Sequence, residues 1–160
     1  MSGLIVKTAV VPGTPPVIEG VIVNDGWFPN VDPAHLRAEH RIRDSVTPER
    51  LRGAVIGAII TVGNQLAAWQ ASQMAAAHGS LAAVPAPQID GTSRFVLLYA
   101  RAIGAYVKAE LVEGYRDTDA TTAGQREVTD LEPSISELRR DAIHAIRDIL
   151  GRARMRAELI

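Results

Sequence analysis

The chain has 160 residues, with 17 basic and 18 acidic side chains and no cysteine. That length fits a single domain with a hydrophobic core of its own. A formal net charge of −1 provides no overall attraction to nucleic acid, which argues against a protein that coats DNA. Without cysteine the chain forms no disulfide and no thiolate metal site, and it has no cysteine nucleophile.

The amino-terminal segment, residues 4–23, is apolar and β-branched, and prolines interrupt it at positions 12, 15 and 16. Proline removes backbone donors, while Val and Ile favour extended backbone, so this composition predicts an extended arm over residues 1–24 with one or two short strands. Such an arm cannot bury both of its faces alone. It lies either on its own helices or on a neighbouring subunit, and the sequence leaves both alternatives open. The first residues do not resemble a secretory signal, which predicts synthesis in the cytosol.

Trp27 and Phe28 stand side by side in a segment that Gly26 and Pro29 interrupt. They cannot belong to a periodic helix face, so we expect them to anchor an irregular backbone segment. Two alternatives are open. The segment is either a loop that fills the chain's own core or an anchor that also contacts a partner.

Two helix starts follow, at Asp32-Pro33 and at Thr47-Pro48, where a capping side chain precedes a proline at the first helical position. They predict a short helix to about Arg41 and a long helix to Ala77. The long helix has one apolar stripe, formed by Leu51, Val55, Ile59, Val62, Leu66 and Trp69. Its most apolar part, residues 53–62, is much shorter than the ~20 residues that a bilayer span needs, so we expect a buried helix.

Further helices are expected in the second half of the chain. After a loop over residues 79–91, Thr92 or Ser93 caps a helix that carries a wide apolar face as far as Leu111. A helix over about 120–131 ends before Pro133, and a last one begins at Ser134 and ends at Gly151. The sequence therefore predicts an all-α fold. It consists of a bundle of four to five helices over residues 25–151, an extended N-terminal arm over 1–24 and an extended C-terminal tail over 152–160.

Candidate catalytic and metal-binding residues do not converge. The histidines lack the spacing of a zinc-binding helix and are expected to be solvated or helix-terminal; they are His35, His40, His78 and His144. A calcium-loop pattern begins at Asp117 but has Thr122 where glycine is needed and Val128 where glutamate is needed. Glu110 and Glu113 are three residues apart, yet nothing else joins them. We therefore expect no catalytic residue, no bound metal and no cofactor.

The C-terminal tail alternates in character. Arg152, Arg154 and Arg156 are separated by small or apolar residues and lead to Leu159-Ile160. An extended tail of this kind presents a basic edge and an apolar edge, which is typical of a strand laid onto a partner. The alternative is a tail that folds back on its own helices. The predicted partner-binding residues, for the portal or a neighbouring subunit, are Trp27, Phe28, Arg152, Arg154, Arg156, Leu159 and Ile160.

Several blocks occur in a characteristic order and spacing: DGWFPNVDP at 25–33, VTPERLR at 46–52, NQLAAW at 64–69, YRDTDAT at 115–121, LEPSISELRRDA at 131–142 and IRDILGR at 146–152. In this order they resemble the head completion proteins of tailed phages with contractile tails, the GpL family, from about Asn24 to Ile160. No single block is specific. Their order and spacing carry the resemblance.

The resemblance implies a non-enzymatic adaptor that forms a ring beneath the portal after DNA packaging, closes the filled head and offers the surface on which the tail docks. It implies these partners: the portal protein, further neck or tail-terminator proteins, and copies of the chain itself in a ring expected to be dodecameric. Packaged DNA passing through the lumen is a further implied contact, and a membrane is not. The implied location is the head–tail neck of the virion, after synthesis in the host cytoplasm.

Two rival functions come from other classes. A nucleic-acid-binding helical regulator would use the arginines between positions 139 and 156 on phosphates, but the near-zero net charge counts against it. Its DNA affinity would fall steeply with added salt. An enzyme of unknown class would need Glu110, Glu113 or a histidine, and no other residue supports these as catalytic groups.

Overall fold

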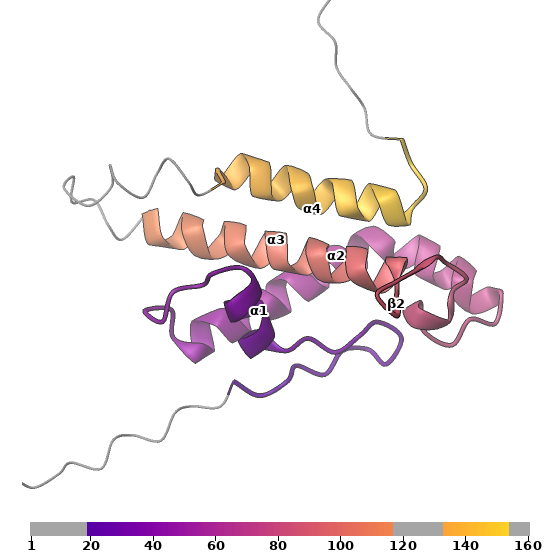
Figure 1. Cartoon of the computed structure of the whole chain (residues 1–160), viewed down its shortest axis with the longest axis horizontal. Helices are drawn as coiled ribbons and strands as arrows, with labels where there is room; N and C mark the ends of the chain where they lie inside the picture. Colours follow the sequence, from indigo (N-terminus) through magenta and orange to yellow (C-terminus); the bar gives the residue numbers. More distant parts are fainter. Residues whose placement is uncertain (1–18, 117–132, 154–160) are drawn as a thin grey trace, which may run out of the picture.

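A computed structural model describes residues 19–116 and 133–153 (Figure 1). Within these ranges the elements, in chain order, are α1 (Pro33–Glu39), α2 (Pro48–Ala75), the 3₁₀ helix η1 (Leu81–Ala83), β1 (Gln88–Ile89), β2 (Thr92–Ser93), α3 (Arg94–Arg116) and α4 (Ile135–Ile149). This part of the chain is mostly helical, in agreement with the predicted all-α class. The predicted helix over 120–131 lies outside the described residues.

Helices α1, α2 and α4 begin where the capping residues predict, whereas the cap predicted for α3 at Thr92 or Ser93 is wrong: both residues form β2, and the buried Ser93 hydroxyl has no hydrogen-bond partner among the described residues. Asp32 accepts a hydrogen bond from the Ala34 backbone at 2.9 Å, and Thr47 caps α2. Ser134 forms a capping box with Glu137: the Ser134 hydroxyl accepts from the Glu137 N–H at 3.2 Å, and the Glu137 carboxylate accepts from the Ser134 N–H at 2.7 Å. Gly151 follows α4 with φ +65°, a left-handed conformation that suits glycine after a helix end.

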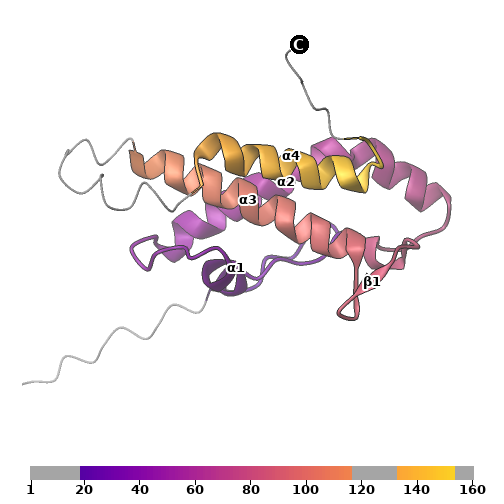
Figure 2. The same ribbon diagram turned by 45° about the horizontal axis from the view of Figure 1, so that its top comes forward.

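The three longer helices form the core. α4 lies beside α3 and runs antiparallel to it, and α2 crosses α3 obliquely (Figures 1 and 2). The buried side chains that these helices contribute include Leu51, Val55, Val62 and Leu66 from α2, Tyr99, Ile103 and Val107 from α3, and Ile146 and Ile149 from α4. The apolar stripe predicted for α2 therefore faces the core, with Ile59 and Trp69 partly buried against it.

α2 is the longest helix of the described chain, at 28 residues, and it ends two residues before the predicted Ala77. By length and composition alone it is apolar enough to cross a membrane, and 33% of its most apolar window is buried inside the protein. The core helix of a soluble protein meets the same criterion. Its inner face packs in this core, whereas its outer face carries exposed Ile56 and Ile60.

The described end of the predicted arm, residues 19–24, lies on its own subunit. Ile22 pairs with Val31 in an antiparallel bridge, through N–O distances of 2.8 and 3.0 Å. Arg37 forms an ion pair with Glu19. These contacts hold residues 19–22 against their own subunit, and the extended arm over residues 1–24 stays a prediction. Residues 1–18 lie outside the described structure, so the choice between own helices and neighbour stays open for them.

The loop predicted over residues 79–91 contains a hairpin that the sequence analysis missed. Gln88 pairs with Ser93 and Ile89 with Thr92. Asp90 and Gly91 form the turn with φ values of 50° and 71°, the left-handed pair that a two-residue hairpin turn needs. The Asp-Gly dipeptide was the available signal. α3 includes the predicted apolar face and ends at Arg116.

Candidate interaction surface

Trp27 and Phe28 are both buried, with 5% of each residue exposed. Trp27 meets Phe28 edge to face at 4.8 Å between ring centroids and meets Trp69 of α2 at 5.9 Å. Phe28 stacks on Tyr99 of α3 at 4.8 Å with an interplanar angle of 11°. The two aromatics therefore join residues 25–29, the aromatic loop, to both α2 and α3.

Asp25 holds the aromatic loop in shape. Its Oδ1 accepts hydrogen bonds from the backbone N–H groups of Trp27 at 2.9 Å and Phe28 at 2.8 Å, and its Oδ2 accepts one from Gln70 at 2.8 Å. Burial alone would raise the pKa of Asp25, but these hydrogen bonds outweigh it, and the pKa lies below its ordinary value. The Trp27 indole N–H donates to the His78 carbonyl at 2.9 Å.

Tyr99 connects the loop to α3 by a further polar contact. The Asn24 side-chain amide donates to the Tyr99 hydroxyl at 2.8 Å. Burial raises the pKa of Tyr99 to about 12, although the Asn24 hydrogen bond acts in the opposite direction. Of the two alternatives for Trp27 and Phe28, the structure places both side chains in the chain's own core. A partner contact by the same segment stays a prediction.

The C-terminal candidates fall only partly inside the described chain. Arg152 follows α4 and is exposed, and its N–H donates to the Arg147 carbonyl at 2.9 Å. The Arg147 guanidinium donates to the Ala153 carbonyl at 3.2 and 2.5 Å, which fixes the chain just after the helix. The remaining predicted partner-binding residues of the tail, Arg154, Arg156, Leu159 and Ile160, lie outside the described residues.

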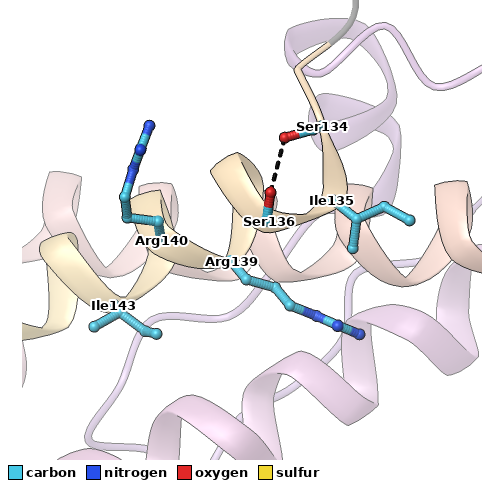
Figure 3. Close-up of a pocket in the computed structure, with 6 residues that line it drawn as sticks. All are labelled: Ser134, Ile135, Ser136, Arg139, Arg140 and Ile143. Atoms are coloured by element: carbon cyan, nitrogen blue, oxygen red, sulfur yellow. Dashed lines mark hydrogen bonds between the residues drawn. The ribbon is translucent and has the colours of Figure 1, made fainter.

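A surface cavity of about 560 Å³ lies at the start of α4 and is lined by Ser134, Ile135, Ser136, Arg139, Arg140 and Ile143 (Figure 3). Arg139 and Arg140 point in different directions in Figure 3. Arg139 forms an ion pair with Glu113 at 2.5 Å, and the Ser134 hydroxyl serves the capping box. An anion-binding site would require the cations and hydroxyls to converge on one point, and here they do not.

The histidines do not assemble a metal site in the described ranges, where no group of three or more His, Cys, Asp or Glu side chains gathers. His35 is exposed beside Glu39 at 3.5 Å. His40 is helix-terminal, as predicted, and its side chain is 21% exposed, but its Nε2 is buried without a hydrogen-bond partner within residues 19–116 and 133–153. Desolvation lowers the pKa of His40, and the Glu39 charge only partly offsets it.

An apolar groove on the outer side of α2 was missed by the sequence analysis. It has a volume of about 390 Å³, and its lining residues are Val21, Ile22, Val23, Arg52, Ile56, Ile59 and Ile60; we call it the α2 groove. Four of these residues are well exposed: Val21 at 52%, Val23 at 78%, Ile56 at 41% and Ile60 at 58%. The available signal was the pair Ile56 and Ile60, which is four residues apart and lies off the core stripe.

The chemistry of the α2 groove suits a protein surface. Its lining is aliphatic except for Arg52, whose guanidinium donates to the Gly20 carbonyl at 3.2 Å. Several of these aliphatic side chains are exposed to solvent side by side. The fold defines the class of protein at a coarse level: a mostly helical protein with an exposed apolar groove.

Comparison with known proteins gives the family. Residues 22–160 match the model of the family described as phage head completion protein (GPL). The chain therefore belongs to the phage head completion protein family, as the resemblance of its sequence blocks predicted. This is a family of structural virion proteins and not of enzymes.

Two curated relatives agree with this assignment. The chain is 37% identical to the head completion/stabilization protein of Escherichia phage P2, over 92% of this chain and 86% of that protein. It is 27% identical to the probable head completion/stabilization protein of Haemophilus phage HP1 (strain HP1c1), over 84% of this chain and 88% of that protein. No solved structure matches the chain.

Proposed function

We propose that the subunit completes the phage head as a member of a ring. In this proposal the ring is dodecameric, seats beneath the portal at the head–tail neck and closes the DNA-filled head. Its other side offers the surface on which further neck or tail-terminator proteins dock. Membership of the head completion family supports the general role. The ring, its place under the portal and the tail-docking surface are the proposal.

The observation that carries the proposal is the α2 groove. Val23 and Ile60 expose 78% and 58% of their surface, although the same chain buries aliphatic side chains completely on the inner face of α2. A monomer gains nothing from this exposure, because apolar area in contact with water is unfavourable by about 25 cal/mol per Å² relative to burial. A ring gives every copy a neighbour that removes the groove from water.

The C-terminal tail supplies the second contact of the proposal. Arg152, just after the end of α4, is exposed. The alternation of arginine with small or apolar residues continues in the sequence to Leu159-Ile160. We assign this segment to the portal, where backbone pairing provides affinity and the arginines select an acidic surface. Each exposed ion pair would add at most about 1 kcal/mol.

The test combines the purified chain with purified portal rings. We expect the chain alone to sediment as a monomer at micromolar concentration, and native mass spectrometry of the mixture to show the portal with one dodecamer of the 17.2 kDa chain. Failure of the chain to bind the portal contradicts the proposed place. Stable closed rings of the chain alone contradict assembly that depends on the portal.

A matched pair of variants connects the α2 groove to the result. Ile60→Lys places a charge in the groove and should abolish ring formation on the portal while the melting temperature stays within the error of the parent's. Leu97→Lys makes the same change at a residue of α3 that is 40% exposed and does not line the groove, and it should assemble normally. Normal assembly of Ile60→Lys would show that the groove is not the interface.

The nucleic-acid alternative is weakened by the engagement of arginines within the chain. Arg139 pairs with Glu113, and Arg147 donates to the Ala153 carbonyl. Two of the three arginines of α4 therefore already have partners within the chain. A titration of DNA binding with salt decides the matter, since a phosphate-binding protein loses affinity steeply as salt rises.

A further inference from the structure

The segment that borders the α2 groove has an unused hydrogen-bonding edge. Both backbone groups of Ile22 are directed at Val31. In extended backbone the groups of successive residues point in opposite directions, so those of Val21 and Val23 are directed away from Val31, at the other edge. Within residues 19–116 and 133–153 they have no hydrogen-bond partner. The groove thus combines an open strand edge with an aliphatic wall.

An open edge beside an apolar wall accepts an extended β-branched peptide. Such a peptide adds a strand through main-chain hydrogen bonds and buries alternate side chains against the wall. In the chain itself, residues 4–11 (LIVKTAVV) have this character. Leu4, Val6 and Val10 fall on one face of an extended segment, while Lys7, the only charge, falls on the other.

Two contacts hold the backbone at the start of the described chain. Arg37 forms an ion pair with Glu19, whose side chain is 9% exposed, and Arg52 donates to the Gly20 carbonyl at 3.2 Å. Both contacts hold the backbone next to Val21. Residues 4–11 are thus joined, through residues 12–18, to a backbone that is held beside a groove of matching chemistry.

The connecting residues favour a neighbouring subunit as the acceptor. A chain that folded back onto its own Val21–Val23 edge would need a tight reversal within residues 12–18. Pro12-Gly13 suits a tight turn, but a turn there would place residues 4–11 opposite residues 14–21 and not opposite Val21–Val23. Pro15 and Pro16, which would then lie in the partner strand, have no N–H to donate. As an extended connection, residues 12–18 reach roughly 20 Å.

We propose that residues 4–11 of each subunit add a strand to the Val21–Val23 edge of the neighbouring subunit and cover its α2 groove. The inference rests on the proposed ring, since it needs copies of the chain side by side. It specifies the contact that joins one copy to the next. The groove of one subunit is then filled by the arm of another all the way around the ring.

The chain has no cysteine, so a pair of introduced cysteines reports one contact without background. Val6→Cys and Ile60→Cys are combined in one chain, which is incorporated into phage particles and oxidised. We expect a ladder of covalent multimers on a denaturing gel. Leu4→Cys and Val10→Cys should also give the ladder with Ile60→Cys, whereas Ile5→Cys and Ala9→Cys, on the other face of the strand, should give much less. Ile56→Cys provides a second reporter if Ile60→Cys reduces incorporation.

The control pairs Val6→Cys with Leu97→Cys on α3, which should stay monomeric. A chain linked only within itself, without a ladder, shows that the arm fills its own groove and overturns the inference. Equal linking to Leu97→Cys, or no dependence on alternate arm positions, overturns it as well. In all these outcomes the chain is present in the particle, so the proposed function stands. Absence of the unsubstituted chain from particles overturns both.

Discussion

The two faces of α2 use the same residue types for different ends. On the inner face Leu51, Val55 and Leu66 are completely buried against α3 and its neighbours. On the outer face Ile56 and Ile60 stay 41% and 58% exposed beside the α2 groove. Helix propensity does not distinguish them. What differs is whether the described chain covers the side chain: it does so on the inner face, and on the outer face it does not.

The N-terminal segment shows the same division along one strand. Towards the core, Asp25 accepts hydrogen bonds from the backbone N–H groups of Trp27 and Phe28. Both backbone groups of Ile22 are hydrogen-bonded to Val31. On the outward edge, the backbone groups of Val21 and Val23 have no partner in the described chain. A strand with one satisfied edge and one open edge is well suited to join a core to a neighbour.

The largest effect is expected from the core side of this comparison. Trp27→Ala removes a ring packed on Phe28 and Trp69 and leaves a cavity, so we expect a loss of roughly 3–5 kcal/mol in the free energy of unfolding. Urea denaturation of the isolated chain measures it. Val23→Ala, at a residue 78% exposed, should change the same quantity by no more than about 0.5 kcal/mol. Similar losses for both variants would remove the distinction between the two regions.

Much of the core side could be predicted from the sequence, because it depends on local signals. Thr47-Pro48 and Ser134 start their helices as predicted, and the stripe through Leu51 and Leu66 faces the core. The position of Trp27 in an irregular segment predicted an anchor, but not that its indole would reach the His78 carbonyl. That contact joins residues 51 positions apart, which no periodic pattern encodes.

The groove side could not be predicted in the same way. It arises where Val21 and Val23 come to lie beside Ile56 and Ile60, and their adjacency depends on the path of residues 24–47 between them. The sequence shows that each of the two segments is apolar, but no local pattern predicts that they lie next to each other in the fold. The Asp90-Gly91 hairpin is different, since its turn signal lies in two adjacent residues.

Gly104 of α3 tests how tightly the core side is packed. Gly104 of α3 is buried, and a Cβ there would lie 1.9 Å from His40 Nε2. Because the His40 ring would have to move away, Gly104→Ala should cost about 1–3 kcal/mol in the free energy of unfolding through overpacking, in spite of the better helix propensity of alanine. Denaturation of the single variant measures this cost.

A double-mutant cycle identifies the cause. If the cost arises from the His40 ring, Gly104→Ala introduced into a His40→Ala background should be tolerated better than in the parent, with a coupling of about 0.5–3 kcal/mol. Strict additivity of the two substitutions would show that the close approach of His40 is not what requires glycine at position 104.

The smallest effect is expected on the outer face, at Gly53 of α2. The residue is exposed in a helix interior, and a Cβ there would meet no atom within 4 Å in the isolated subunit. Gly53→Ala should therefore raise the free energy of unfolding by about 0.5–1 kcal/mol through helix propensity alone, seen as a higher urea midpoint with an unchanged slope. Lower stability would mean that the outer face is packed more tightly than the exposed groove indicates. If the stabilised variant nevertheless assembles poorly on the portal, a neighbouring chain approaches α2 closely at Gly53, and the glycine serves the interface at the expense of the subunit.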